Sequence, residues 1–359
     1  MVTIKVPGKL ILLGEYALLE GAPGIVCGVD RFAFISVKEA PDSYFVFDSP
    51  TLNFRKISFT VHKNGKVNFT TNLKEEELKQ LRLFQSIFEF LWKELKSVGM
   101  EITPVQISLN TNDFYSAEFK NKLGFGSSAA VTVALIAALS CFAGRVVESV
   151  EGKSEIFNRA LKAHRLAQGN LGSGIDVAAS SYGGTLAYKM AVDAVHEHQI
   201  PESLEAWPDL SMSVVWSGKS TSTSKMIKRL AIYKNSQPKN YDRLMTNLIN
   251  LSMAGISSYK EKDARGFTEI VKQYFQALFS LGNKAGIPII SPVHERLALL
   301  VESLGGAYKP SGAGDGDIGI AFAHSAELMK SIKNKIISEN FKLIPIQIVN
   351  HGFMFEDNV

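Results

Sequence analysis

The segment Lys122-Leu-Gly-Phe-Gly-Ser-Ser-Ala-Ala130 joins a glycine- and serine-rich loop to a long apolar run. Its two glycines, Gly124 and Gly126, allow the backbone to approach a ligand closely and to turn N–H groups toward it. The residues that follow, 127–143, favour a helix, and the first turn of a helix presents unpaired N–H groups at the positive end of its dipole. This combination predicts an anion site, with a glycine turn capped by serines as the alternative.

Two common phosphate-binding sequences do not account for this loop. The pattern G-x-x-x-x-G-K-S is incomplete at Gly218-Lys219-Ser220, because Ser213 stands where its first glycine belongs. Residues 124–129 have the letters of a dinucleotide fingerprint, but the strand expected before them ends near Leu109. Since that fingerprint follows its strand at once, a Rossmann domain is not predicted.

Length and composition limit the class of protein. The chain has 359 residues, which at roughly 150 residues per domain suggests about two domains. It has 46% hydrophobic and 21% charged residues, as globular proteins do, and its net charge of +4 does not indicate a nucleic-acid surface. Cys27 and Cys141 lie in apolar surroundings and are expected to be reduced core thiols. The N-terminus lacks the layout of a secretory signal and the run 129–143 is short for a membrane span, so we expect a soluble cytoplasmic protein without a membrane partner.

Strands and helices alternate along the chain. Alternating or continuous apolar residues predict strands at 2–6, 10–13, 32–38, 44–48, 57–62, 105–109, 211–216, 317–323 and 343–349. Helical spacing and capping residues predict helices at 74–97, 127–143, 153–168, 222–232, 241–257, 265–282, 292–304 and 325–339. A polar, less patterned stretch at 191–209 marks a junction. We therefore predict an α+β protein with domains at 1–195 and 196–359.

Two further glycine-rich segments stand out, Gln168-Gly-Asn-Leu-Gly-Ser-Gly-Ile-Asp176 and Ser311-Gly-Ala-Gly-Asp-Gly-Asp317. Either segment alone could be a plain connection. Their occurrence together with 122–130, and with Lys9 beside Pro7-Gly8, is hard to explain by turns alone. It indicates one site assembled from distant parts of the chain.

These segments resemble the motifs of the superfamily named for its galacto-, homoserine, mevalonate and phosphomevalonate kinases, the GHMP kinases. The three motifs occur in order, as Pro7-Gly-Lys-x-x-Leu-x-Gly-Glu-Tyr16, Gly124-Phe-Gly-Ser-Ser-Ala-Ala130 and Ser311-Gly-Ala-Gly314. The resemblance implies an N-terminal domain like domain 2 of ribosomal protein S5, a ferredoxin-like C-terminal domain and a site in the cleft between them. It also implies ATP and Mg²⁺ as cofactors.

Three details resemble the phosphomevalonate kinases within that superfamily: Lys122 before the phosphate loop, Gly-Glu-Tyr at 14–16, and the segment 163–179. The implied reaction is ATP-dependent phosphorylation of (R)-5-phosphomevalonate to the diphosphate, in the mevalonate pathway of isoprenoid biosynthesis. Mevalonate kinase is the nearest alternative. A diphosphomevalonate decarboxylase is disfavoured by Asp176 in Ser-Gly-x-Asp. A non-catalytic ligand sensor on the same fold is disfavoured because Lys9, Ser128 and Asp176 are all present.

The resemblance also implies roles for individual residues. Lys9 and Asp176 take the catalytic positions, and Ser128 is the implied magnesium ligand. The nucleotide phosphates are expected at Lys122, Gly124, Gly126, Ser127, Ser128 and Ala129, and the acceptor at Glu15, Tyr16, His164, Ser173, Gly174, Gly312, Ala313 and Gly314. Two positions depart from the pattern. His164 stands where mevalonate kinases carry a magnesium-binding glutamate, and Asp315 replaces a usual glycine.

Several of these residues have a second interpretation. Ser128 could simply cap a helix, His164 could hydrogen-bond within the core, and Asp315 could contact metal or face solvent. Lys219, Ser220 and Thr221 stand at an expected helix start after the strand 211–216. A hydroxyl-rich helix N-terminus with lysines suits the phosphate of the acceptor, with capping and solvated lysines as the alternative.

The acceptor decides what Asp176 has to do. An alcohol holds its proton tightly and needs a base. A phosphate monoester, with a second pKa of about 6, is mostly ionised at neutral pH. For a phosphate acceptor we therefore expect Asp176 to orient Lys9 or the metal ion rather than to remove a proton.

Overall fold

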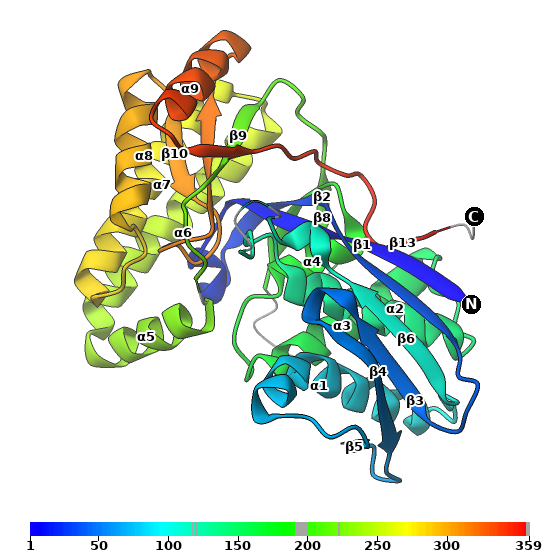
Figure 1. Cartoon of the computed structure of the whole chain (residues 1–359). Coiled ribbons are helices and arrows are strands. Elements are labelled where there is room, and N and C mark those ends of the chain that lie inside the picture. Colours follow the sequence, from blue (N-terminus) through cyan, green and yellow to red (C-terminus); the bar gives the residue numbers. More distant parts are fainter. Residues whose placement is uncertain (117, 119–120, 191–199, 222, 357–359) are drawn as a thin grey trace.

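The computed structural model describes residues 1–116, 118, 121–190, 200–221 and 223–356, which form two β-sheets with helices packed on them (Figure 1). The larger sheet has the order β13-β1-β2-β6-β3-β4-β5, and β7 and β8 continue from β2. All its pairs are antiparallel except β3 with β6. Its strands are β1 (Val2–Leu13), β2 (Pro23–Glu39), β3 (Phe45–Ser49), β4 (Phe54–Val61), β5 (Val67–Phe69), β6 (Val105–Asn110), β7 (Thr185–Lys189), β8 (Glu202–Leu204) and β13 (Met354–Phe355).

Four helices pack beside this sheet: α1 (Glu75–Ser97), α2 (Ser127–Phe142), α3 (Val150–Ala167) and α4 (Ile175–Tyr182). The central one, α2, contacts β1 and β2 as well as the other three helices. Because neighbours surround it, nearly all of its residues are buried, and its sequence is apolar on every side. The prediction of a buried helix directly after the phosphate loop is confirmed.

The smaller sheet has the order β10-β11-β9-β12, with antiparallel pairs throughout. In chain order, helices connect β9 to β10 and β11 to β12, which is the ferredoxin-like arrangement. The predicted α+β architecture is therefore confirmed. The elements are β9 (Ser211–Trp216), α5 (Thr223–Ser236), α6 (Pro238–Lys260), α7 (Ala264–Ala285), α8 (Pro292–Ser303), β10 (Ala307–Pro310), β11 (Ile318–Ala323), α9 (Ala326–Ser338) and β12 (Lys342–Ile344).

Several strand predictions are wrong in their extent. The strand predicted at 32–38 is only the second part of β2, which begins at Pro23. The runs at 2–6 and 10–13 form one strand, β1, in which a register shift between Pro7 and Gly8 accommodates the proline. β12 ends at Ile344 instead of near 349, because Pro345 has no N–H for the next ladder hydrogen bond.

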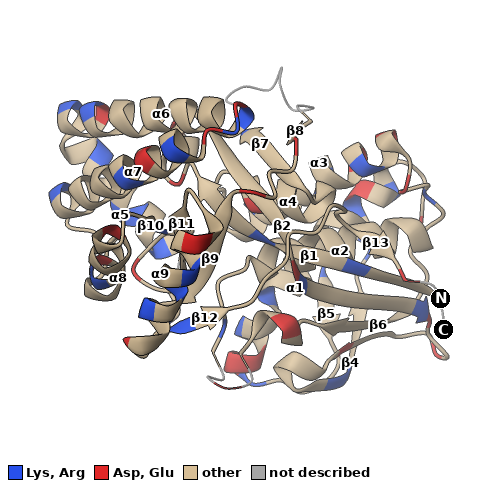
Figure 2. Cartoon of the chain, turned by 90° about the horizontal axis from the view of Figure 1, so that it is seen from above, with Lys and Arg blue, Asp and Glu red and all other residues tan. Residues whose placement is uncertain are grey.

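The end of the chain returns to the larger sheet. There the N–H of Val349 donates to the carbonyl of Gly28, and β13 pairs with β1. The start of β1 and β13 consequently lie on the same side of the molecule (Figures 1 and 2). The predicted boundary between 195 and 196 lies outside the described residues.

Charge is distributed over the whole molecule, with basic and acidic residues interspersed along elements of both sheets and their helices (Figure 2). Both cysteines are free; Cys27 is buried and Cys141 is partly buried. Within the described ranges, no helix combines the length and the apolar character that a bilayer span requires.

Candidate active site

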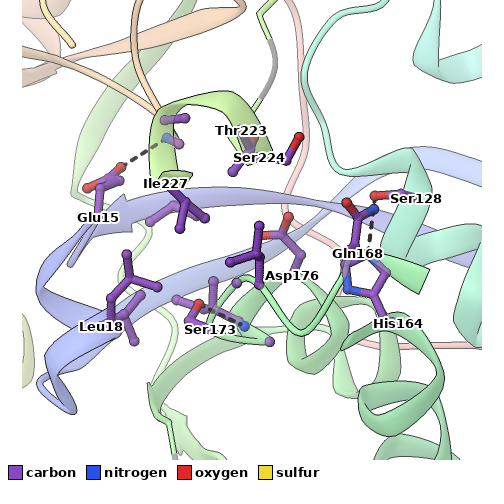
Figure 3. A pocket seen from close by; sticks show the side chains of 18 of the residues that line it. Glu15, Leu18, Ser128, His164, Gln168, Ser173, Asp176, Thr223, Ser224 and Ile227 are labelled. Carbon is purple, nitrogen blue, oxygen red and sulfur yellow. Dashed lines mark hydrogen bonds between the residues drawn. The ribbon is translucent and has the colours of Figure 1, made fainter. Parts of the chain in front are cut away.

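A cavity of about 380 Å³ lies where the two halves of the molecule meet. Figure 3 shows Asp176 near its middle, Ser128 and His164 toward one end, and Glu15 with Leu18 toward the other. Elements from both halves line it, including β1, the start of α2, the end of α3 and the start of α5. The predicted site residues that line it are Lys9, Glu15, Tyr16, Lys122, Ser128, His164, Ser173, Gly174, Asp176, Thr221, Gly312 and Ala313.

The loop before α2 has the geometry of an anion site. Gly126 is the N-cap residue with a φ of 78°, and no side chain caps this helix. A Cβ atom on Gly126 would lie 2.7 Å from Cγ of Lys9, so both the left-handed backbone and the close approach of Lys9 require glycine. The open end of α2 can therefore offer its N–H groups to an anion.

Three further residues of this loop and the first turn of α2, Gly124, Ser127 and Ala129, do not line the cavity but pack behind its surface. Gly124 lies against Asp317, and a Cβ atom on it would be 2.5 Å from that of Asp317. Ser127 is buried in the first turn of α2, and Ala129 is fully buried one residue after Ser128. The loop is thus packed on both sides, by Lys9 and by Asp317.

Lys9 and Asp176 meet inside the cavity. The backbone N–H of Lys9 donates to the carbonyl of Phe125 at 2.9 Å, and its side chain is only 6% exposed. Asp176 stands in the first turn of α4, which begins after Gly174. Nζ of Lys9 is 3.8 Å from Oδ1 of Asp176, a separation within ion-pair range but longer than a hydrogen bond. An added Cβ on Gly312 would lie 3.7 Å from the same Nζ, so all three glycine segments approach this ammonium.

Ser128 is paired with His164. Nε2 of His164 lies 3.3 Å from Oγ of Ser128, which joins α3 to α2. Burial lowers the pKa of His164, and the nearby Asp176 partly opposes that shift. The lowered pKa favours the neutral form of the imidazole at pH 7.

A buried ion pair holds the first and third motifs together. Nζ of Lys309 is 2.5 Å from Oε1 of Glu15, and the two side chains are 0% and 2% exposed. The N–H of Gly312 donates to the same oxygen at 3.3 Å, and the hydroxyl of Tyr16 donates to the carbonyl of Ala313 at 2.6 Å. Among the described residues, Oε2 of Glu15 has no hydrogen-bond partner.

The three residues expected to bind the phosphate of the acceptor take different positions. Nζ of Lys219 is 2.5 Å from Oδ1 of Asp315, and Lys219 is not among the residues that line the cavity. The hydroxyl of Ser220 donates to the carbonyl of Lys122 at 2.8 Å. Thr221 does line the cavity. Gly314, from the third motif, lies outside it, against Ile289.

Two ionisable groups beside the phosphate loop have shifted pKa values. Burial lowers the pKa of Lys122, although Asp317 opposes that shift. Burial also raises the pKa of Asp317. The hydrogen bond from the N–H of Thr221 and the charges of Lys9 and Lys122 partly oppose that rise. Lys9, Lys122 and Arg165 line the cavity with Glu15 and Asp176, and Lys309 neutralises Glu15. The remaining cationic excess favours anionic ligands.

Sequence reasoning missed several residues of the site. Arg165 and Gln168 line the cavity beside His164, and the four-residue spacing of His164 and Gln168 on one helix was a usable signal. Leu18 and Ile227 are among the apolar residues that line it, and no local pattern marks them. Lys309 belongs to the site only because it pairs with Glu15, which is distant in the sequence.

The oxygen donors of the cavity fit magnesium. Ser128 supplies a hydroxyl and Asp176 a carboxylate, the ligand type that Mg²⁺ prefers. The described part of the chain contains no cluster of three His, Cys, Asp or Glu side chains that could hold a metal ion alone. Since Mg²⁺ usually keeps several waters and binds through substrate phosphates, these donors suit an ion that arrives with a nucleotide.

Residues 82–184, which include the phosphate loop and Asp176, match the family described as GHMP kinases N terminal domain. It is similar to the phosphomevalonate kinase of Streptomyces sp. (strain CL190), with 28% identity over 339 residues and 88% of each chain. It is also 23% identical to the mevalonate kinase of Saccharolobus solfataricus over 99% of each chain. Streptococcus pneumoniae phosphomevalonate kinase in complex with phosphomevalonate and AMPPNP superposes with a TM-score of 0.79 at 19% identity, over 97% of this chain and 100% of that one. The predicted GHMP kinase fold is confirmed.

Proposed function

We propose that this protein is a kinase that transfers the terminal phosphate of ATP to (R)-5-phosphomevalonate, forming the diphosphate. The position of Lys9 supports this reaction most directly. Its buried ammonium lies beside the phosphate loop, beside Gly312 and 3.8 Å from Asp176. A compact cation at that point neutralises charge on the transferred group as it passes from donor to acceptor.

The two substrates would occupy opposite ends of the cavity. The phosphates of ATP would lie over residues 122–129, where the N–H groups at the start of α2 and the cation of Lys122 face them. Ser128 would hold Mg²⁺ together with waters, and the ion would supply charge neutralisation on those phosphates. The acceptor would extend from Lys9 toward Glu15, Tyr16 and α5.

A phosphorylated acceptor is supported by the electrostatics of the cavity. Its cations exceed its uncompensated acids, because Lys9, Lys122 and Arg165 line it while Lys309 neutralises Glu15. The similarity to a phosphomevalonate kinase over 88% of each chain supports the same acceptor. Mevalonate remains the second candidate, because a mevalonate kinase matches over 99% of each chain. A cytoplasmic location stays a prediction.

A coupled assay of ADP release with separate acceptors tests this proposal. We expect Mg²⁺-dependent turnover with phosphomevalonate and much less with mevalonate, homoserine or galactose. Faster turnover of mevalonate would assign the second candidate. Release of carbon dioxide from diphosphomevalonate would assign a decarboxylase, and binding of ATP and phosphomevalonate without turnover would assign a sensor.

A further inference from the structure

The loop between β9 and α5 is bound by backbone hydrogen bonds to the glycine-rich segment 311–317, which contains the third motif. The N–H of Ser217 donates to the carbonyl of Asp317 at 2.9 Å, and the N–H of Asp317 donates to the carbonyl of Lys219 at 2.7 Å. From the other side, Nε2 of His294 lies 3.1 Å from the carbonyl oxygen of Gly316. The two loops therefore form one packed unit.

Asp315 adds two side-chain contacts to this unit. Its Oδ1 is 2.5 Å from Nζ of Lys219, and its Oδ2 accepts a hydrogen bond from the hydroxyl of Thr221 at 3.3 Å. The φ of Asp315 is 63°, a left-handed conformation that glycine takes easily and aspartate tolerates. A carboxylate thus occupies a position where the backbone favours glycine, and both of its oxygens bind the same loop.

That loop carries one wall of the cavity. Thr221 lines the cavity, and α5, which begins at Thr223, contributes Thr223, Ser224 and Ile227 (Figure 3). The hydroxyl of Ser220 also ties the loop to the carbonyl of Lys122 beside the phosphate loop. Asp315 therefore bonds the loop that carries this hydroxyl-bearing surface, next to the phosphate loop.

We propose that Asp315 is a positioning residue for the acceptor: by holding Lys219 and Thr221, it fixes the wall formed by Thr221 and the first turn of α5 at the place where the acceptor binds. This inference rests on the proposed function, because that wall faces the acceptor end of the cavity. Polar groups that are already in place bind a ligand without the cost of ordering them. Lys219 acts in this arrangement as a partner of Asp315 and not as a direct ligand.

Steady-state kinetics of Asp315→Asn and Asp315→Gly with phosphomevalonate and ATP test the proposal. Both residues accept a left-handed backbone, so the folded state is kept and only the carboxylate is lost. We expect the KM for phosphomevalonate to rise about tenfold, the size of one lost charge-assisted hydrogen bond, while kcat and the KM for ATP stay within about twofold. Glu202→Gln, which removes the acid of the remote exposed pair with Lys260, is the control and should leave all three constants unchanged.

The sign of the change in KM separates the possible roles of Lys219. If Lys219 bound the acceptor directly and Asp315 competed for it, Asp315→Asn would lower the KM for phosphomevalonate. That result, or an unchanged KM, would overturn the proposal. In the double variant Lys219→Met with Asp315→Asn, the KM should rise no further than in Asp315→Asn, because both changes break one contact. A wild-type enzyme that does not turn over phosphomevalonate would refute the proposed function instead.

Discussion

At the scale of single residues, the chemistry of the site converges on Lys9. Its side chain is 6% exposed and runs past Gly126, so its ammonium is held where little water screens it. Its partner Asp176 is 31% exposed and 3.8 Å away. This separation suits a carboxylate that orients a cation.

Asp176→Asn tests whether the carboxylate orients or removes a proton. We expect magnesium-dependent turnover of phosphomevalonate to fall only about tenfold, because the attacking phosphate oxygen is already ionised near neutral pH. Loss of an essential general base removes about 10² to 10⁴ in rate. In Lys9→Met, measured in parallel, kcat should fall roughly a thousandfold, because the cation that neutralises charge in the transition state is lost.

The outcome is clear if binding of both substrates is measured by calorimetry alongside the rate. A loss as large in Asp176→Asn as in Lys9→Met, with binding intact, would show that Asp176 acts as a base.

At the scale of elements, the residue before helix α2, Gly126, leaves the first N–H groups of the helix without a side-chain cap. Gly126 has a left-handed backbone and no room for a side chain on the Lys9 face. Gly144, just after the other end of α2, also has a positive φ, 90°, but nothing lies within 4 Å of its missing side chain. Both glycines have a positive φ, but only Gly126 is closely packed where a side chain would stand.

Gly126→Ala should reduce kcat about a hundredfold, because the methyl group pushes the Lys9 stem away from its position. Gly144→Ala is the matched control, since it carries the same backbone strain of about 1–2 kcal/mol without the steric clash. Rates and urea unfolding of the two variants should show similar losses of stability but very different losses of activity. Equal activities would contradict the steric argument.

His294 links α8 to the third motif, and its titration should be visible in stability. Its Nδ1 is 2.8 Å from the hydroxyl of Tyr308 and its Nε2 is 3.1 Å from the carbonyl of Gly316. Burial lowers the pKa of His294 to about 4 from an ordinary 6.5. Between pH 6.5 and 4, His294 is therefore protonated in the unfolded chain but remains neutral in the folded protein.

We expect this group to remove about 3 kcal/mol from the free energy of unfolding between pH 6.5 and 4, and none above pH 7. Urea unfolding across that range should show the extra slope in the wild type and not in His294→Gln. Parallel pH profiles of the two proteins would refute the assignment.

At the scale of the whole molecule, the Glu15–Lys309 pair joins the two halves. Each residue belongs to a different sheet or its adjoining loop, and both side chains are buried. Burial lowers the pKa of Lys309, while Glu15 opposes the shift. Such a pair adds little to the free energy of unfolding, but a buried charge left without its partner lowers it strongly.

Lys309→Met should lower the free energy of unfolding by about 3–5 kcal/mol at pH 7, because Glu15 is left buried and unpaired. Combining it with Glu15→Gln removes both charges and should restore most of that loss. Chemical denaturation of both variants measures the effect. A loss below about 1 kcal/mol in Lys309→Met would mean that water reaches Glu15.

Much of the architecture could be predicted because it depends on local pattern. The phosphate loop and α2 follow from glycines at required backbone positions and from an apolar run of helical length. β9 was predicted at its observed bounds, 211–216, since its residues follow one strand signal. The end of β12 was overestimated: Pro345, which ends the strand, was a usable local signal, but the pairing of residues after it with Gly28 and Asp30 depends on tertiary structure.

The sequence by itself predicted that three glycine segments and Lys9 assemble into one site, and the resemblance of its motifs added Asp176; the structure brings these residues together. Their role in binding phosphate stays a prediction. Only the tertiary structure decided that Glu15 pairs with Lys309, that His164 contacts Ser128, and that Lys219 is held by Asp315. Each of these contacts joins residues 36 to 294 positions apart. Burial and charge pairing at such separations depend on how the two halves pack, and no local pattern records that packing.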